Sequence, residues 1–297
     1  MTALPADALA ALDDAVEDAL AGGGEAGLRV LGYGEISTVV AWGAAGGEVA
    51  CKRLPPFPDL ARFDAYRGCV VGYLDRLRAA GVEPVATAVQ GRPRPDGTVG
   101  AYCVQPRLPG DALLPSLLAR GSDIEVERAL EAVIDRIVAC VSSRLGLDGH
   151  LSNWAQIDGA LRYLDVSTPL ERDDQGHERL DGTVFLASLP WALRGVVSRF
   201  LLRDILDKYY DPRGVVLDLL GNLHKEGLHR HVPRAVEIAA ARIAPAITAD
   251  EVRRYYRGDA RTWAFLQRAR RFDRFWQRRV RRRVYPFLLP GRIDRRV

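Results

Sequence analysis

Three polar side chains between residues 148 and 165 have the types and spacing needed to hold a hard metal cation beside a substrate. Asp148, Asn153 and Asp165 are separated by two short apolar runs, which Asp158-Gly159 joins. An Asp-Gly pair between apolar runs predicts a tight hairpin, so Asn153 would enter one strand and Asp165 would leave the other. Mg²⁺ prefers carboxylate, amide and phosphate oxygens. We therefore predict that Asn153 and Asp165 hold Mg²⁺, with Asp148 nearby and facing a substrate.

A glycine-rich turn, from Gly32 to Val39, lies upstream between two β-rich runs. It lacks the third glycine and the following helix of a dinucleotide-binding fingerprint, because Ser37 leads directly into the strand-like run of residues 38–42. Glycine permits positive φ and close approach, so the backbone N–H groups of such a turn can cover phosphates. A plain hairpin turn is the alternative interpretation.

Lys52 lies in a third β-rich run, among apolar neighbours from Val49 to Leu54. A lysine in an apolar strand is costly unless its ammonium reaches solvent or an anion. The chain has only two other lysines, Lys208 and Lys225, so a lysine at a required position rarely arises by chance. We favour an anion-binding role over that of an edge-strand solubility residue.

Taken in order, these motifs resemble those of the protein-kinase-like fold, including its aminoglycoside and choline phosphotransferase branch. The matching positions are Gly32, Gly34, Ser37 and Val39 for G-x-G-x-x-[GS]-x-V, Lys52 for V-A-x-K, and Asp148, Asn153 and Asp165 for D-x-x-x-x-N and the later Asp. His150, two residues after Asp148, resembles the D-x-H-x-x-N pattern of the phosphotransferase branch. The motifs span somewhat under half of the chain.

The resemblance implies an enzyme that uses ATP and Mg²⁺ to phosphorylate a hydroxyl group of a small molecule or peptide. The glycine-rich turn would cover the phosphates, Lys52 would neutralise their oxygens, and Asp148 would accept the hydroxyl proton. His150 would contact the transferring phosphoryl group or cap its loop. The linker that begins with Gln105 would be the hinge, where Gln105 and Arg107 would bind adenine through the backbone.

Several family features are absent. The helix after Lys52 carries Gly72 where the family spacing expects a glutamate, Gly146 replaces a histidine before Asp148, and Ser167 replaces the glycine of D-F-G. No A-P-E motif follows. These departures argue against a regulated eukaryotic-type protein kinase. They leave a divergent phosphotransferase or, as the alternative, a catalytically impaired pseudokinase acting as a nucleotide-binding or scaffold module.

The elements that must position these residues form an α+β, two-lobed pattern of the kinase-like type. We predict an N-terminal helix and loop at 1–24, an N-lobe with five antiparallel strands and one helix at 25–107, and a helical C-lobe with the catalytic loop at 108–297. The expected strands are 28–31, 36–42, 48–54, 85–89 and 101–105; the expected helices are 6–21, 58–80, 112–119, 124–145, 185–210, 215–227, 232–244, 249–256 and 262–284.

Composition narrows the class of protein. The 297 residues are 48% hydrophobic, enough for a sizeable core. Neither a membrane-spanning run nor a secretion signal is evident, which predicts a cytoplasmic protein. The four cysteines are scattered singly, so we expect reduced thiols rather than disulfides or a zinc site.

The C-terminal region is strongly basic. Between Gln267 and Val297, twelve arginines face two aspartates, a local charge of +10 against +4 for the whole chain. The helix expected at 262–284 carries an aromatic stripe, which we expect to pack on the domain. A basic amphipathic surface for anionic lipid or nucleic acid is the alternative.

Overall fold

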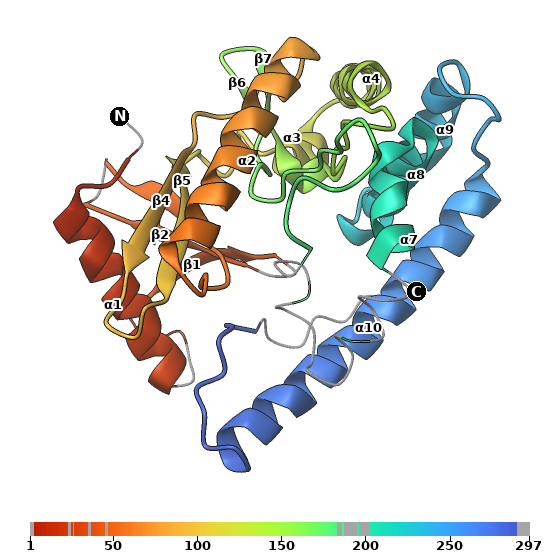
Figure 1. Ribbon diagram of the computed structural model, residues 1–297. Helices are drawn as coiled ribbons and strands as arrows, with labels where there is room; N and C mark the ends of the chain where they lie inside the picture. Colours follow the sequence, from red (N-terminus) through yellow and green to blue (C-terminus); the bar gives the residue numbers. More distant parts are fainter. Residues whose placement is uncertain are drawn as a thin grey trace.

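A computed structural model of the protein shows a β-sheet part joined to a mainly helical part (Figure 1). It describes residues 3–22, 25, 27–34, 37–44, 47–182, 186, 195 and 202–289. The helix expected at 185–210 falls largely outside these residues. The predicted α+β class is confirmed, with a five-stranded antiparallel N-terminal sheet and a mainly helical C-terminal part.

The sheet has the strand order β1-β2-β3-β5-β4, and every neighbouring pair is antiparallel. Its register sets Lys52 on β3 beside Val39 of β2 and Cys103 of β5. The strands are β1 (Arg29–Tyr33), β2 (Thr38–Trp42), β3 (Val49–Arg53), β4 (Ala88–Pro93) and β5 (Val99–Pro106). Lys52 is therefore held on a strand that is paired on both sides.

Two helices cover opposite faces of the sheet. Because side chains alternate along a strand, Tyr102 and Val104 of β5 pack with α1 (Ala6–Gly22), whereas Ala101 and Cys103 pack with α2 (Leu60–Ala79). The α1 helix is fixed by Asp13, whose carboxylate accepts two hydrogen bonds from Arg94 at 2.7 and 2.9 Å. The N-terminal helix thus belongs structurally to the sheet part.

The helical part begins after β5. A capping box of Ser122 and Glu125 starts α4, and Asp211 caps α8. The helices are α3 (Leu114–Arg120), α4 (Asp123–Cys140), α7 (Leu202–Asp207), α8 (Pro212–Lys225), α9 (Val232–Ala240) and α10 (Ala249–Arg279), with short 3₁₀ turns at Leu151–Asn153, Lys208–Tyr210 and His229–His231.

The predicted hairpin is present as β6 (Trp154–Ile157) and β7 (Ala160–Tyr163). Asp158 and Gly159 form its turn with φ of 50° and 75°. Two consecutive positive φ values characterise the primed turns that match the twist of a hairpin. The local sequence therefore brings the residues before and after the hairpin close together.

Several predicted boundaries were wrong, among them the end of the helix expected at 232–244, which is α9 and ends at Ala240. The strand expected at 85–89 begins at Ala88, because the Val85 N–H instead donates to the Tyr163 carbonyl at 2.8 Å. The helix expected at 124–145 ends at Cys140, where the Ser142 hydroxyl accepts from the Leu145 N–H at 3.2 Å and forms a competing turn.

A further correction concerns the C-terminal helices. The two helices expected at 249–256 and 262–284 are the single α10. Its interior Gly258 costs helix stability on the order of 1 kcal/mol. Buried Val252, Tyr256 and Ala260, spaced four residues apart, hold the helix continuous against the domain.

The segment after α10 returns to the sheet part (Figure 1). Tyr285, Phe287 and Leu289 form a small buried cluster, and Leu288 packs on the core beneath α1. The Pro286 carbonyl accepts from Arg53 of β3 at 2.8 Å. This connection joins the two ends of the described chain.

Within the described residues, no helix is long and apolar enough to cross a membrane.

Candidate active site

A cavity of about 320 Å³ lies where the sheet part meets the helical part. It is lined from β3, the hairpin, α8 and α10. Its walls include Gly34, Ser37, Lys52, Asp148, His150, Asn153, Tyr163, Asp165, Ile205, Tyr209, Asp218, Asn222, Lys225, Tyr255, Asp259, Trp263 and Gln267.

A close ion pair joins the two parts inside this cavity. The Lys52 Nζ atom lies 2.7 Å from Asp165 Oδ1, and about a fifth of each side chain is exposed, 21% and 23%. Ser167 donates its hydroxyl to the same oxygen at 3.0 Å. Burial alone would raise the pKa of Asp165, but the lysine and the serine outweigh it and lower that pKa. Asp165 is therefore an anion held directly against a cation.

Helix α2 reaches this pair through a tyrosine. The Tyr66 hydroxyl donates to the Ser167 carbonyl at 2.8 Å, just after Asp165 in sequence. Gly72, at the position where a glutamate was expected, offers no carboxylate. The α2 helix thus positions the backbone that follows Asp165 rather than pairing with Lys52.

The loop carrying Asp148 is fixed by backbone contacts. The Asp148 carbonyl accepts from Asn153 Nδ2 and from the Tyr163 hydroxyl, each at 3.2 Å. Its side-chain Oδ1 accepts from the His150 N–H at 3.1 Å. Asn153 and Tyr163 lie at the two ends of the hairpin, so the hairpin and the loop form one unit.

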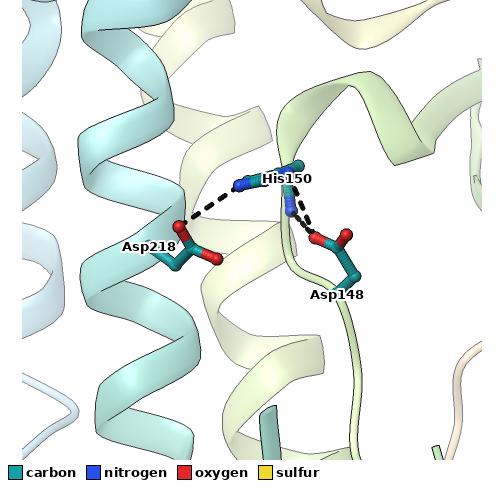
Figure 2. A group of neighbouring side chains, drawn as sticks. All are labelled: Asp148, His150 and Asp218. Carbon is teal, nitrogen blue, oxygen red and sulfur yellow. Dashed lines mark hydrogen bonds and ion pairs between the residues drawn. The ribbon is translucent and has the colours of Figure 1, made fainter. Parts of the chain in front are cut away.

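His150 lies between two carboxylates (Figure 2). Its Nδ1 is 3.3 Å from Asp148 Oδ1, and its Nε2 is 3.2 Å from Asp218 Oδ1. Burial by itself lowers the pKa of His150, but Asp148 and Asp218 outweigh it and raise that pKa to about 9. The three ligand atoms lie close enough to surround a cation. The raised pKa favours the protonated imidazole, in which both ring N–H groups would donate to the two carboxylates.

Asp218 is the centre of a second network. Its Oδ2 is 3.2 Å from Lys208 Nζ, and its Oδ1 accepts from the Tyr255 hydroxyl at 2.8 Å. Burial would raise the pKa of Asp218, but His150 and Lys208 lower it strongly. All three lysines of the chain therefore lie at the cavity: Lys52 and Lys225 line its wall, and Lys208 contacts Asp218.

Sequence reasoning missed Asp218 and Asn222, both on α8. A lone acid between Val215 and Leu220 was a detectable signal, because an aspartate in an apolar helical run needs a buried partner. Asn222 is 3% exposed, and its Oδ1 accepts from the Leu151 N–H at 3.1 Å.

Two buried amide atoms at the cavity have no hydrogen-bond partner within the described part of the chain. They are Nδ2 of Asn222 and Oε1 of Gln267, which come from α8 and α10. Gln267 is only 5% exposed. A buried polar group without a partner is costly, so a ligand that opened this part of the wall would find one donor and one acceptor there.

The structure brings together most of the predicted site residues. The cavity wall includes Gly34, Ser37, Lys52, Asp148, His150, Asn153 and Asp165. Among the described residues that line it, Gly32, Val39, Gln105 and Arg107 do not occur.

These four residues have other contacts. Gly32 and Val39 pair with each other between β1 and β2. The Gln105 amide donates to the Leu164 carbonyl at 2.8 Å, and Arg107 forms an ion pair with Glu48. The predicted adenine contacts through Gln105 and Arg107 therefore remain predictions.

The fold and site define a protein whose sheet and helical parts meet at an ion-paired polar cavity. The chain belongs to a family described as a family of unknown function, DUF6206, whose sequence profile matches residues 11–274. No curated protein is significantly similar to it in sequence. Among solved structures, the kinase domain of PknI from M. tuberculosis is similar at 17% sequence identity, over 72% of this chain and 96% of that chain, with a TM-score of 0.30.

Proposed function

We propose that this protein is a phosphotransferase that uses ATP and Mg²⁺ to transfer the γ-phosphoryl group to a hydroxyl group. The observation that carries the proposal is the contact of 2.7 Å between Lys52 Nζ and Asp165 Oδ1. It places a cation and an anion from the two parts of the molecule in a cavity that also contains Asp148 and Asn153. Phosphoryl transfer depends mainly on positioning and charge neutralisation, which these groups can supply.

The side chains at the cavity fit the two cofactors. A Cβ atom at Gly34 would lie 2.5 Å from Ser37 Oγ, so a side chain at position 34 would displace the Ser37 hydroxyl at the cavity wall. Lys52 would neutralise phosphate oxygens, and the oxygens of Asn153 and Asp165 would hold Mg²⁺. A bound Mg²⁺ would supply positive charge to neutralise the phosphate oxygens.

Asp148 is the proposed general base. Its Oδ1 faces His150, and its Oδ2 has no hydrogen bond within the residues that the structure describes. His150 would fix the orientation of Asp148 through its contact with Oδ1. Asp148 would then orient the acceptor hydroxyl and take its proton, a contribution of about 10²–10⁴-fold in rate for a general base.

We infer that the acceptor is a small hydroxyl-bearing molecule at the α8–α10 end of the cavity. The unpaired Asn222 Nδ2 can donate to a hydroxyl oxygen, and the unpaired Gln267 Oε1 can accept from a hydroxyl. The spacing of Asp148, His150 and Asn153 supports placing the enzyme near the aminoglycoside and choline phosphotransferase branch rather than among peptide kinases.

A pseudokinase is the second candidate. The observations that favour it are the missing carboxylate on α2 and the engagement of Asp165 by both Lys52 and Ser167. Such a module would bind nucleotide, or none, without phosphoryl transfer. Metal-dependent turnover of ATP distinguishes the two candidates.

The test uses the purified chain, with ATP binding read from the thermal unfolding midpoint with and without Mg²⁺ and turnover read in the presence of small polyols and amino alcohols. We expect Asp148→Asn to bind ATP normally and lose about 10²–10⁴-fold in turnover. Asp165→Asn should lose Mg²⁺-dependent binding. Asp158→Asn, an exposed change in the turn of the same hairpin, should leave both measurements unchanged.

Two results separate the outcomes. If the wild type binds ATP but shows no turnover with any acceptor, the pseudokinase is favoured and the phosphotransferase is overturned. Absence of any Mg²⁺-dependent shift with ATP would overturn the enzyme, and would leave only a pseudokinase that binds no nucleotide.

A further inference from the structure

The outward surface of α10 carries four aromatic rings in contact with solvent. Phe265, Phe272, Phe275 and Trp276 are 62, 65, 58 and 37% exposed. Residues 265, 272 and 276 share one stripe because their spacings of seven and eleven residues are close to whole helical turns. We call these four rings the α10 outer face. Single exposed apolar residues are ordinary, but four on one helix face call for a partner.

The opposite side of α10 faces the protein. Tyr256, Gln267, Arg270 and Asp273 are all buried, and α10 runs along one edge of the molecule (Figure 1). The stripe of rings therefore cannot turn into the core without withdrawing Gln267 from the cavity wall and Arg270 from its position over the Phe287 ring. The outer face is a fixed surface of the folded protein.

Arginines flank the rings. Arg261, Arg268 and Arg279 on the helix are exposed, and so are Arg281, Arg282 and Arg283 immediately after it. The combination of bulky rings with a surrounding belt of fixed positive charge characterises helices that lie in a membrane interface. The positive charge of these arginines also requires that the partner be anionic.

We propose that the α10 outer face docks on the surface of a membrane rich in anionic lipids. The rings would enter the boundary between headgroups and acyl chains, and the arginines would contact lipid phosphates. A nucleic acid would satisfy the arginines through its phosphates but would leave the stripe of rings in water. A second copy packed on the same face would bring two arginine belts together, and their repulsion disfavours it.

The experiment is co-sedimentation of the full chain with vesicles of neutral phosphatidylcholine and with vesicles containing about one third phosphatidylglycerol, at low and at near-physiological salt. We expect binding to the anionic vesicles only, weakened by salt. Phe265→Ser with Phe272→Ser should reduce the partition coefficient roughly tenfold or more, because both rings leave the interface. Arg261→Gln with Arg268→Gln should reduce it by a similar factor at low salt.

Matched controls lie on α4. Ile124 is 64% exposed, and Arg128 is exposed on the same helix. Ile124→Ser and Arg128→Gln remove comparable groups from a different surface and should leave vesicle binding unchanged. The unfolding midpoints of all variants should match the wild type, because each change is at an exposed position.

Three results would overturn the proposal. The first is no binding of the wild type to anionic vesicles at low salt. The second is wild-type dimerisation by light scattering that the serine pair abolishes, which would make a second copy the occupant. The third is vesicle binding that the serine pair leaves intact while a DNA duplex competes for the arginines, which would make the surface a phosphate-binding one without insertion.

Discussion

His150 is the residue whose position between two carboxylates joins the loop of Asp148 to α8. It contacts Asp148 on one side and Asp218 on the other, from a position where only about a quarter of its side chain, 27%, is exposed. Two carboxylates this close would repel each other without a cation between them. The imidazolium therefore holds the loop and α8 together as well as orienting the proposed base.

This arrangement predicts a defined pH dependence of stability. The pKa of His150 is raised from 6.5 to about 9 in the folded protein. A raised pKa stabilises the fold fully below the unfolded value and loses that contribution as the pH rises through the folded value. The difference in unfolding free energy between wild type and His150→Gln should therefore be on the order of 3 kcal/mol below pH 6.5 and should diminish towards pH 9.

The measurement is urea unfolding of both proteins across this pH range. His177→Gln is the control, because His177 is exposed and lies outside the cavity. It should run parallel to the wild type at every pH. A His150→Gln difference that is constant from pH 6 to 10 would show that the imidazole is not the titrating link.

Some of the site residues could be predicted from the sequence and others could not. Lys52, Asp148, Asn153 and Asp165 were accessible because each stands in a short motif whose local structure, a strand or a hairpin, is encoded nearby. Asp218 contributes through His150, 68 positions earlier in the chain, so no local spacing announces their contact. The only indication of Asp218 in the sequence was the energetic cost of placing a charged side chain within an apolar helix face.

At the scale of elements, the loop that carries Asp148 and His150 packs tightly between two helices at Gly149. A Cβ atom at Gly149 would lie 2.8 Å from Val215 Cγ1 on α8 and 2.9 Å from Ile137 Cδ1 on α4. Both neighbours belong to the main hydrophobic core. The absence of a side chain at position 149 thus sets how deeply Asp148 and His150 enter between the helices.

Gly149→Ala should destabilise the protein by about 1–3 kcal/mol, because the methyl group overpacks the core. It should also lower turnover, since the two flanking residues move with the loop. Gly68→Ala is the matched control: Gly68 is exposed within α2, and its added Cβ meets nothing within 4 Å. That variant should be about 0.5–1 kcal/mol more stable, from helix propensity.

Urea denaturation of both variants checks these signs. Equal effects of the two substitutions would contradict tight packing at Gly149.

The helices and strands themselves were largely predictable, because helical and alternating periodicities are local properties. Their ends were less so: the β4 start and the α4 end depend on hydrogen bonds to Tyr163 and Ser142, and the continuity of α10 through Gly258 depends on packing against the domain.

At the scale of the whole molecule, α10 and the segment after it connect the helical part back to the sheet. Arg278 donates to the Ala21 carbonyl at 2.9 Å, and Arg53 donates to the Pro286 carbonyl. Phe287 is 7% exposed within its cluster. Contacts between residues more than 200 positions apart leave no periodic pattern in the sequence, so this connection could not be predicted from local spacing.

Phe287→Ala should therefore reduce the unfolding free energy by about 3 kcal/mol, as a buried aromatic does when it is truncated. Val284→Ala, three residues earlier and 52% exposed, should change it by less than about 0.5 kcal/mol. Chemical denaturation compares the two. Similar small effects would mean that the segment contributes nothing to the connection between the parts.

The concentration of lysine at the cavity has a practical consequence for chemical labelling. Lys52, Lys208 and Lys225 are the only lysines in the sequence, and each lines the cavity or contacts one of its carboxylates. A mild amine-acylating reagent, read by peptide mass spectrometry, would therefore report on the cavity at every lysine it modifies. Protection of Lys52 by a nucleotide, or of Lys225 by a candidate acceptor, would locate each ligand before any turnover is measured.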